Sequence, residues 1–253
     1  MPYRVGFFVG AVIASTACSY SVTFDDCQVT CAGGESCPTD LTCVSGLCRT
    51  AGSTGACGSN VPPGDLTLTQ TADTKIDHSL QFGCQNTDST TPEQSWYRVF
   101  SLVTAGVTGT FHIDKITIGI NTSVGGAASG SGAGSDGLPR VDVKVGTYAG
   151  GATDATLDLS KVTAIKASTI EIPATQITEL VDAPLSADIP AGSKLIVEVH
   201  NADFKGTARQ VVLGATDAAE TANAYLRAPF CSATVPTPPS SQAHIVITVT
   251  GSH

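Results

Sequence analysis

Short segments in which apolar and polar residues alternate are the feature that most constrains how this chain folds. The clearest are 66–70 (LTLTQ), 141–145 (VDVKV), 195–199 (LIVEV) and 245–249 (IVITV). Side chains of a β-strand point alternately to its two faces, so this pattern predicts half-buried strands. Further strand candidates are 95–102, 111–120, 169–172 and 210–213.

Two details refine this strand pattern. The apolar positions between residues 111 and 120 change parity across Asp114 and Lys115, which predicts a β-bulge. No stretch shows convincing helical periodicity, and residues 217–225 (DAAETANAY) form either a short helix or an ordered loop. Short alternating strands separated by turn signals favour an all-β fold, an antiparallel β-sandwich of jelly-roll or immunoglobulin-like type, over a parallel α/β sheet.

A small cysteine-dense module precedes the predicted sandwich. It contains Cys27, Cys31, Cys37, Cys43, Cys48 and Cys57 and very few large apolar residues. Such a segment cannot bury enough apolar surface to be stable by itself. We therefore expect disulfides to stabilise it, each by about 2–4 kcal/mol. Clustered cysteines can alternatively bind zinc, but there is no Cys-x-x-Cys pair and no nearby histidine, so we predict no metal site here.

Two further cysteines, Cys84 and Cys231, follow this module in the chain. We expect them to pair with each other, although pairing within the module does not by itself fix their partners. The stretch 52–64, rich in Gly, Ser and Pro, predicts a linker. We therefore divide the chain into residues 18–57, a linker at 58–64, and a sandwich domain at 65–253.

The N-terminus has the pattern of an export signal, which we assign to residues 1–17. An apolar run at 5–14 (VGFFVGAVIA) follows a short basic start and precedes small residues. The run is too short to span a membrane, which takes roughly 20 residues. Ser15-Thr16-Ala17-Cys18 resembles a bacterial lipobox, although Ser15 stands where Leu, Val or Ile is usual.

Lipidation of Cys18 would leave eight cysteines, an even number for a disulfide framework. The chain would then be attached to a membrane through Cys18, and Ser19 resembles the residue found there in lipoproteins sorted to the outer membrane. The alternative is cleavage after Ala17 to give a freely secreted protein.

Two regions carry resemblances to known proteins. Residues 37–49 (CPTDLTCVSGLCR) resemble the short EGF-like segments behind the lipid anchor of bacterial surface lipoproteins, which implies a stalk. Segments from 96 to 251, including WYRVFSL, GTFHIDKITIGIN and HIVITVTG, resemble a β-sandwich domain of secreted bacterial proteins. That resemblance implies an exported sandwich and brings no catalytic residues with it.

The net charge and the absence of known motifs exclude several classes of function. The formal net charge is −9 with scattered Lys and Arg, which disfavours nucleic acid as a partner. EF-hand spacing, Gly-x-Ser-x-Gly and His-Glu-x-x-His are absent, and the glycine-rich stretch 125–137 lacks the Gly-Lys-Ser/Thr ending of a phosphate loop. We predict no cofactor, no metal and no enzymatic activity.

Histidines and aromatic residues are the remaining site candidates. His112, His200 and His244 fall on predicted strands opposite the apolar face, where a solvent-facing position is the simplest interpretation. Sequence spacing leaves open that they converge with Asp114 or Asp203.

Aromatic side chains either fill a core or stack on sugars. We expect Trp96 and Phe100 in the core. Tyr225 and Phe230, in a predicted loop, are the candidate ligand-binding residues.

The resulting hypothesis is a non-enzymatic lipoprotein of the outer membrane or cell surface, whose sandwich binds a glycan, a matrix polymer or a partner protein. One alternative is a structural or accessory subunit of a bacterial envelope assembly. Another is a hydrolase with a site assembled from distant loops.

Overall fold

The computed structural model describes residues 37, 41–44, 47–50, 65–125, 137–174, 178–239 and 243–253. The chain divides into two compact units, Met1–Pro62 and Pro63–His253. Within the described residues, no helix is long and apolar enough to cross a membrane.

In the first unit, strands β1 (Leu41–Val44) and β2 (Leu47–Thr50) form an antiparallel hairpin. A disulfide joins Cys37 to Cys48, whose Cα atoms are 5.5 Å apart. Predictions about Cys18, Cys27, Cys31, Cys57 and the side chain of Cys43 fall outside the described residues.

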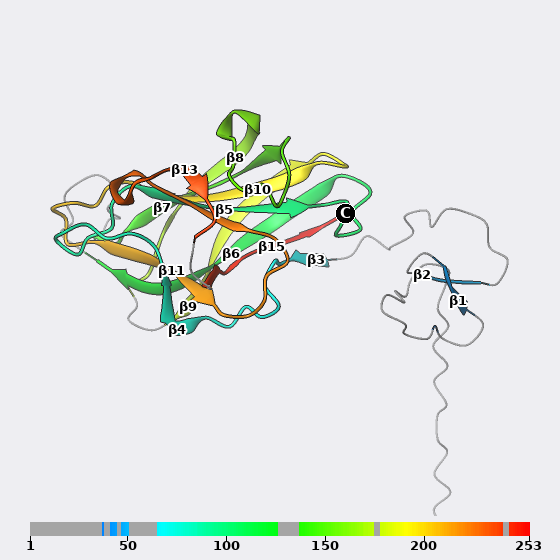
Figure 1. Cartoon of the computed structure of the whole chain (residues 1–253), viewed down its shortest axis with the longest axis horizontal. Helices are drawn as coiled ribbons and strands as arrows, with labels where there is room; N and C mark the ends of the chain where they lie inside the picture. The colour runs from blue at the N-terminus through cyan, green and yellow to red at the C-terminus, as the bar shows by residue number, and fades with distance from the viewer. Residues whose placement is uncertain are drawn as a thin grey trace, which may run out of the picture. The chain divides into compact units, whose positions relative to one another are not determined.

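The second unit consists of two antiparallel sheets (Figure 1). The six-stranded sheet has the order β13-β12-β5-β10-β7-β8. Its strands are β5 (Gln94–Ser101), β7 (Arg140–Tyr148), β8 (Val162–Glu171), β10 (Lys194–Asn201), β12 (Ala224–Ala228) and β13 (Ala233–Thr237).

The seven-stranded sheet has the order β14-β11-β6-β15-β3, with β4 pairing to β11 and β9 to β6. Its strands are β3 (Asp65–Leu68), β4 (Asp77–Phe82), β6 (Phe111–Val124), β9 (Glu179–Ile189), β11 (Gln210–Thr216), β14 (His244–Ile245) and β15 (Ile247–Ser252). Two short 3-10 turns, η1 (Leu159–Lys161) and η2 (Pro229–Cys231), complete the described elements. The all-β, antiparallel prediction is therefore confirmed, and the two sheets form a sandwich-like arrangement.

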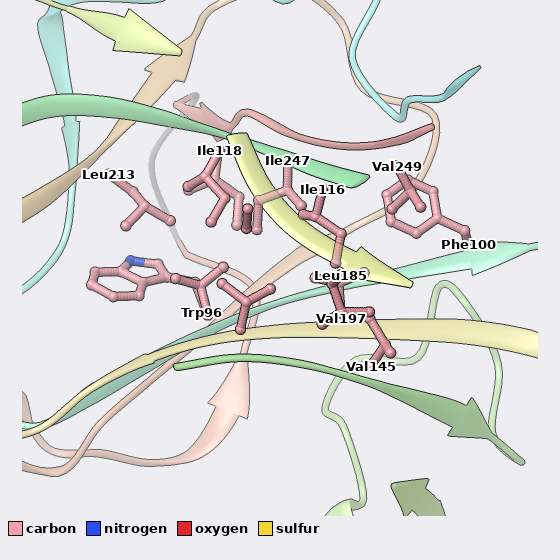
Figure 2. Packing of buried hydrophobic residues seen from close by; sticks show 14 of the residues in the cluster. Trp96, Phe100, Ile116, Ile118, Val145, Leu185, Val197, Leu213, Ile247 and Val249 are labelled. Carbon is pink, nitrogen blue, oxygen red and sulfur yellow. The ribbon is translucent and has the colours of Figure 1, made fainter. Parts of the chain in front are cut away.

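The core lies between the two sheets, where the apolar side chains of their inner faces meet (Figure 2). Trp96 and Phe100 are 0 % and 3 % exposed, as predicted. The indole Nε1 of Trp96 donates to the carbonyl oxygen of Phe82 at 2.8 Å, so this buried polar group is satisfied.

A buried cation also links the sheets. Arg98 of β5 is completely buried, and its guanidinium donates to Glu220 at 2.8 Å and to the carbonyl oxygen of Ile245 at 2.6 Å. Burial lowers the pKa of Arg98, and the facing Glu220 carboxylate acts in the opposite direction and favours the charged form. The disulfide Cys84–Cys231 adds a covalent link, as predicted, between the turn after β4 and η2.

The predicted strands correspond to β3, β5, β6, β7, β10 and β11, with small differences in their ends. The pairing of β6 with β9 shifts register between Ile113 and Lys115, which confirms the predicted bulge. The segment 245–249 is interrupted at Val246. The backbone of that residue bonds to Gly119 and Gly214 in place of continuing a regular ladder.

Three elements differ from the expectation. Residues 217–225 contain no helix, since 224–228 is strand β12. Strand β9 was not predicted because Pro184 interrupts its pattern, and proline is tolerated there because β9 lies at a sheet edge. The segment 169–172 is the end of the longer strand β8, whose mostly exposed side chains give no alternation.

A candidate ligand groove on the outer face of the six-stranded sheet

Strand register brings chemically different side chains into rows across the outer face of the six-stranded sheet. Tyr97 of β5 lies opposite Glu198 of β10 and Tyr225 of β12. One row contains Arg227, Ser95, His200 and Asp142, the next contains Tyr225, Tyr97, Glu198 and Lys144, and a third contains Val99, Ile196 and Gly146. The face is therefore polar on one side and apolar on the other.

Residues 149–161, here called the cover segment, pack over the apolar side of this face. Leu157 is 1 % exposed and joins a second hydrophobic cluster with Tyr97, Tyr148 and Tyr225. The hydroxyl of Tyr225 donates to the carbonyl oxygen of Asp154 at 2.8 Å. The amide of Leu157 donates to the carbonyl oxygen of Pro236 in β13 at 3.0 Å. The cover segment is thus fixed to the sheet by packing and by hydrogen bonds.

Beside the cover segment lies a groove of about 400 Å³. It is lined by Ser95, Tyr97, Lys144, Val145, Gly146, Leu159, Val162, Ala164, Ile196, Glu198, His200 and Arg227. A Cβ atom on Gly146 would collide with the carbonyl oxygen of Thr163, so the close approach of β7 and β8 here requires glycine. The size is within the range of small-molecule sites, about 300–1,000 Å³.

Glu198 is the central polar residue of the groove. Its carboxylate accepts a hydrogen bond from the Tyr97 hydroxyl at 3.2 Å and pairs with Lys144 at 3.3 Å. Burial, and secondarily the charge of Glu198, raise the pKa of Tyr97, so its phenol remains protonated and donates. Glu198 is therefore held between the Tyr97 hydroxyl and the Lys144 ammonium.

His200 is a neutral group in this setting. Its Nδ1 lies 2.9 Å from the Ser95 hydroxyl. Burial, and then the charge of Lys144, lower the pKa of His200 below its usual 6.5. Near neutral pH the imidazole is therefore uncharged and presents one donor and one acceptor.

Arg227 completes the polar side. It pairs with Glu93 at 2.8 Å, and the hydrogen bond to that carboxylate raises the pKa of Arg227. Lys144 and Arg227 are each matched by a carboxylate, and His200 is neutral, so the groove carries little net charge. It offers fixed donors and acceptors beside an apolar surface, an arrangement suited to a neutral ligand bearing hydroxyl groups.

The two aromatic residues predicted to bind ligand have different positions. The prediction that Tyr225 lies in a loop is wrong, because this residue belongs to β12. Its side chain is completely buried and supports the cover segment through its hydrogen bond to Asp154. Its ring is not available for stacking. Phe230 is 54 % exposed on η2 but is not among the residues that line the groove.

The polar groove residues Ser95, Lys144, Glu198 and Arg227 were not singled out from the sequence. Their one signal is polarity at positions that alternate with core residues, which any solvated strand shares. His200 was expected to face solvent, and it does lie opposite the core face, but it is half-buried and lines the groove.

The outer face of the seven-stranded sheet carries a second polar cluster. His112 Nδ1 lies 2.6 Å from Asp188, and its Nε2 lies 3.3 Å from the Ser186 hydroxyl and 3.7 Å from Asp114. The hydrogen bond to Asp188 raises the pKa of His112. The contacts run from Ser186 to His112 and from His112 to Asp188, as in a hydrolase triad. The side chains of His112 and Asp188 are, however, 45 % and 71 % exposed. Water therefore screens the electrostatic contacts that such a triad depends on.

The other convergences that the sequence spacing left open do not occur. Asp203 accepts a hydrogen bond from Asn86 at 3.0 Å, and His244 pairs with Glu220 at 3.0 Å. Among the residues described, no group of three or more His, Cys, Asp or Glu side chains is placed to hold a metal ion.

Comparisons with known proteins add little to this geometry. No family model matches the chain, and no curated protein matches it. Among solved structures, the chain is similar to the clostridial cysteine protease Cwp84 after propeptide cleavage, with a TM-score of 0.44 and 12 % identity. The match covers 74 % of this chain and 40 % of that one. A likeness of this size carries no inference about activity.

Proposed function

We propose that this chain is a non-enzymatic glycan-binding protein whose sandwich holds its ligand in the groove on the six-stranded sheet. The observation that supports this proposal is the groove itself, in which Glu198, Lys144, His200 and Arg227 have fixed partners beside the apolar surface of Ile196 and Val162. Sugars have hydroxyl groups on their edges and C–H groups on their faces, so they need both kinds of contact.

The test is a glycan array probed with the full chain, followed by titration calorimetry of each hit. We expect binding to at least one glycan and a loss of about tenfold in affinity for Glu198→Gln, since a charge-assisted hydrogen bond is about twice as strong as a neutral one. The amide of this variant would keep the shape of the side chain, and its oxygen would still accept from Tyr97. A clean array, or equal affinity for the variant, contradicts the proposal.

We also propose that the chain is presented at the cell surface through a lipid on Cys18. The supporting observation is the leader followed by Ser15-Thr16-Ala17-Cys18. Mass spectrometry of the mature protein should show an acylated Cys18 at its N-terminus. A mature chain that begins at an unmodified Cys18 would identify it as secreted.

The alternative to glycan binding is hydrolysis at Ser186, which contacts His112, which in turn contacts Asp188. We expect no activity from this cluster, because it is open to solvent. Rates with activated esters should be the same for the unmodified chain and for Ser186→Ala. A rate that falls at least tenfold in Ser186→Ala, with the fold intact, would establish the hydrolase.

A further inference from the structure

The groove crosses the strands and does not follow any one of them. Its lining residues come from five neighbouring strands, β12, β5, β10, β7 and β8, together with η1. Neighbouring strands lie about 4.8 Å apart, so the face crossed by the groove is roughly 19 Å wide. A single sugar ring would occupy only part of that width.

A second hollow, of about 430 Å³, adjoins the groove. It lies between the end of the cover segment and β13, and Leu159 lines both hollows. Leu159 is 40 % exposed and Val235, which lines the second hollow, is 49 % exposed. Two large apolar side chains are thus presented to solvent at these hollows, and Leu159 is common to both.

The residues next to Leu159 are fixed in place. Asp158 caps η1 by accepting from the amide of Ser160 at 3.1 Å. Leu157, next to it, is buried and bonded to Pro236. The exposed position of Leu159 is therefore built by the buried residues around it and does not result from a loose chain end.

The type of ligand follows from where the groove lies. On this face the backbone groups of β5, β10 and β7 are already used in ladders on both sides, so an extended peptide cannot add here as another strand. Contacts must come from side chains, and the charges of Lys144 and Arg227 are matched within the protein. Among the described residues that line the groove, each Lys and Arg has a carboxylate partner, so a polyanion finds no surplus cation there. The chain as a whole carries a formal charge of −9.

Resting on the glycan-binding function proposed above, we propose that the ligand is a neutral polysaccharide chain. It crosses the strands of the six-stranded sheet and continues over Leu159 into the second hollow. Affinity then depends on ligand length, and Val235 contacts only the longer ligands.

The experiment is calorimetry of the full chain with neutral gluco-, manno- and xylo-oligosaccharides, from monosaccharide to hexasaccharide, and with oligogalacturonates as the acidic series. We expect affinity to rise at least tenfold from disaccharide to hexasaccharide in one neutral series. Val235→Asp should remove about that gain and leave disaccharide binding unchanged. Leu159→Ala should weaken the binding of both disaccharide and hexasaccharide.

Leu180→Asp is the matched control, because Leu180 is a comparably exposed leucine, 48 %, on β9 of the other sheet. It should change neither affinity, and circular dichroism should show all variants folded. Three outcomes would overturn the proposal of an extended neutral ligand while leaving glycan binding intact. They are equal affinity for all ligand lengths, a preference for oligogalacturonates, and normal binding of hexasaccharide by Val235→Asp. Loss of glycan binding in every series, together with a clean array, would overturn the proposed function itself.

Discussion

The outer faces of the two sheets carry similar pairs of residues. On the six-stranded sheet His200 contacts Ser95 at 2.9 Å, and Lys144 pairs with Glu198 at 3.3 Å. On the seven-stranded sheet His112 contacts Ser186 at 3.3 Å, and Lys115 pairs with Asp182 at 2.8 Å.

What differs is the surroundings of those pairs. The cover segment packs through its own Leu157 onto Tyr225, and its Leu159 forms one side of the groove around Glu198, whose side chain is 21 % exposed. Asp182, its counterpart, is 53 % exposed. The two faces therefore differ in the cover segment, which is anchored by the buried Leu157, and not in the type of polar residue that they carry.

Removing the support of the cover segment should have the largest effect. Tyr225→Ala deletes a completely buried ring and the hydrogen bond to Asp154, which should lower the free energy of unfolding by about 3–5 kcal/mol. Thr117→Ala on the other face removes only an exposed hydroxyl bonded to Asp182 and should change it by less than about 0.5 kcal/mol. Denaturant unfolding of both variants measures the difference, and similar losses would show that the cover segment is not specially supported.

Removing Lys144 from its pair with Glu198 should have an intermediate effect, which is on ligand affinity. Lys144→Ala leaves Glu198 in the groove without its cation and should weaken glycan binding by about tenfold, or about 1.4 kcal/mol. Lys115→Ala, the same change on the open face, should leave the affinity unaltered. Calorimetry with one array hit compares the two directly. If Lys115→Ala were the damaging change, the ligand would belong to the seven-stranded sheet.

The smallest effect is in the titration of the two histidines. The pKa of His112 is raised above 6.5 by its hydrogen bond to Asp188, whereas burial lowers that of His200. His112 therefore contributes stability that is fully present below pH 6.5 and is lost as the pH rises through its folded pKa. His200 contributes stability that is present above pH 6.5 and is lost as the pH falls through its folded pKa.

Histidine ring signals followed by NMR between about pH 4 and 9 should place the two midpoints on opposite sides of 6.5. His112→Gln and His200→Gln assign the signals. Coincident midpoints would mean that the two faces do not differ in burial in solution.

Much of the fold could be predicted from the sequence because alternation is a local signal. Ile116, Ile118 and Ile120 point inward by spacing alone, and the parity change at Asp114 and Lys115 marks the bulge. The expected pairing of Cys84 with Cys231 is present, although the even number of cysteines in the cysteine-dense segment allowed this pairing without fixing it. β12 was missed because Tyr225 and its neighbours show no alternation that separates a strand from a loop.

Residue spacing was thus enough to predict an all-β chain with a buried Trp96 and with His112 and His200 on outer faces, because side-chain direction along a strand depends on spacing. Tertiary structure alone decided that Tyr97, Lys144, Glu198 and Arg227, which are far apart in the chain, lie in neighbouring rows. It also decided that the segment 149–161 covers the apolar side of those rows and leaves the polar side as a groove. The physical reason is that strand order and register are set by packing of the whole sandwich, which no local pattern encodes.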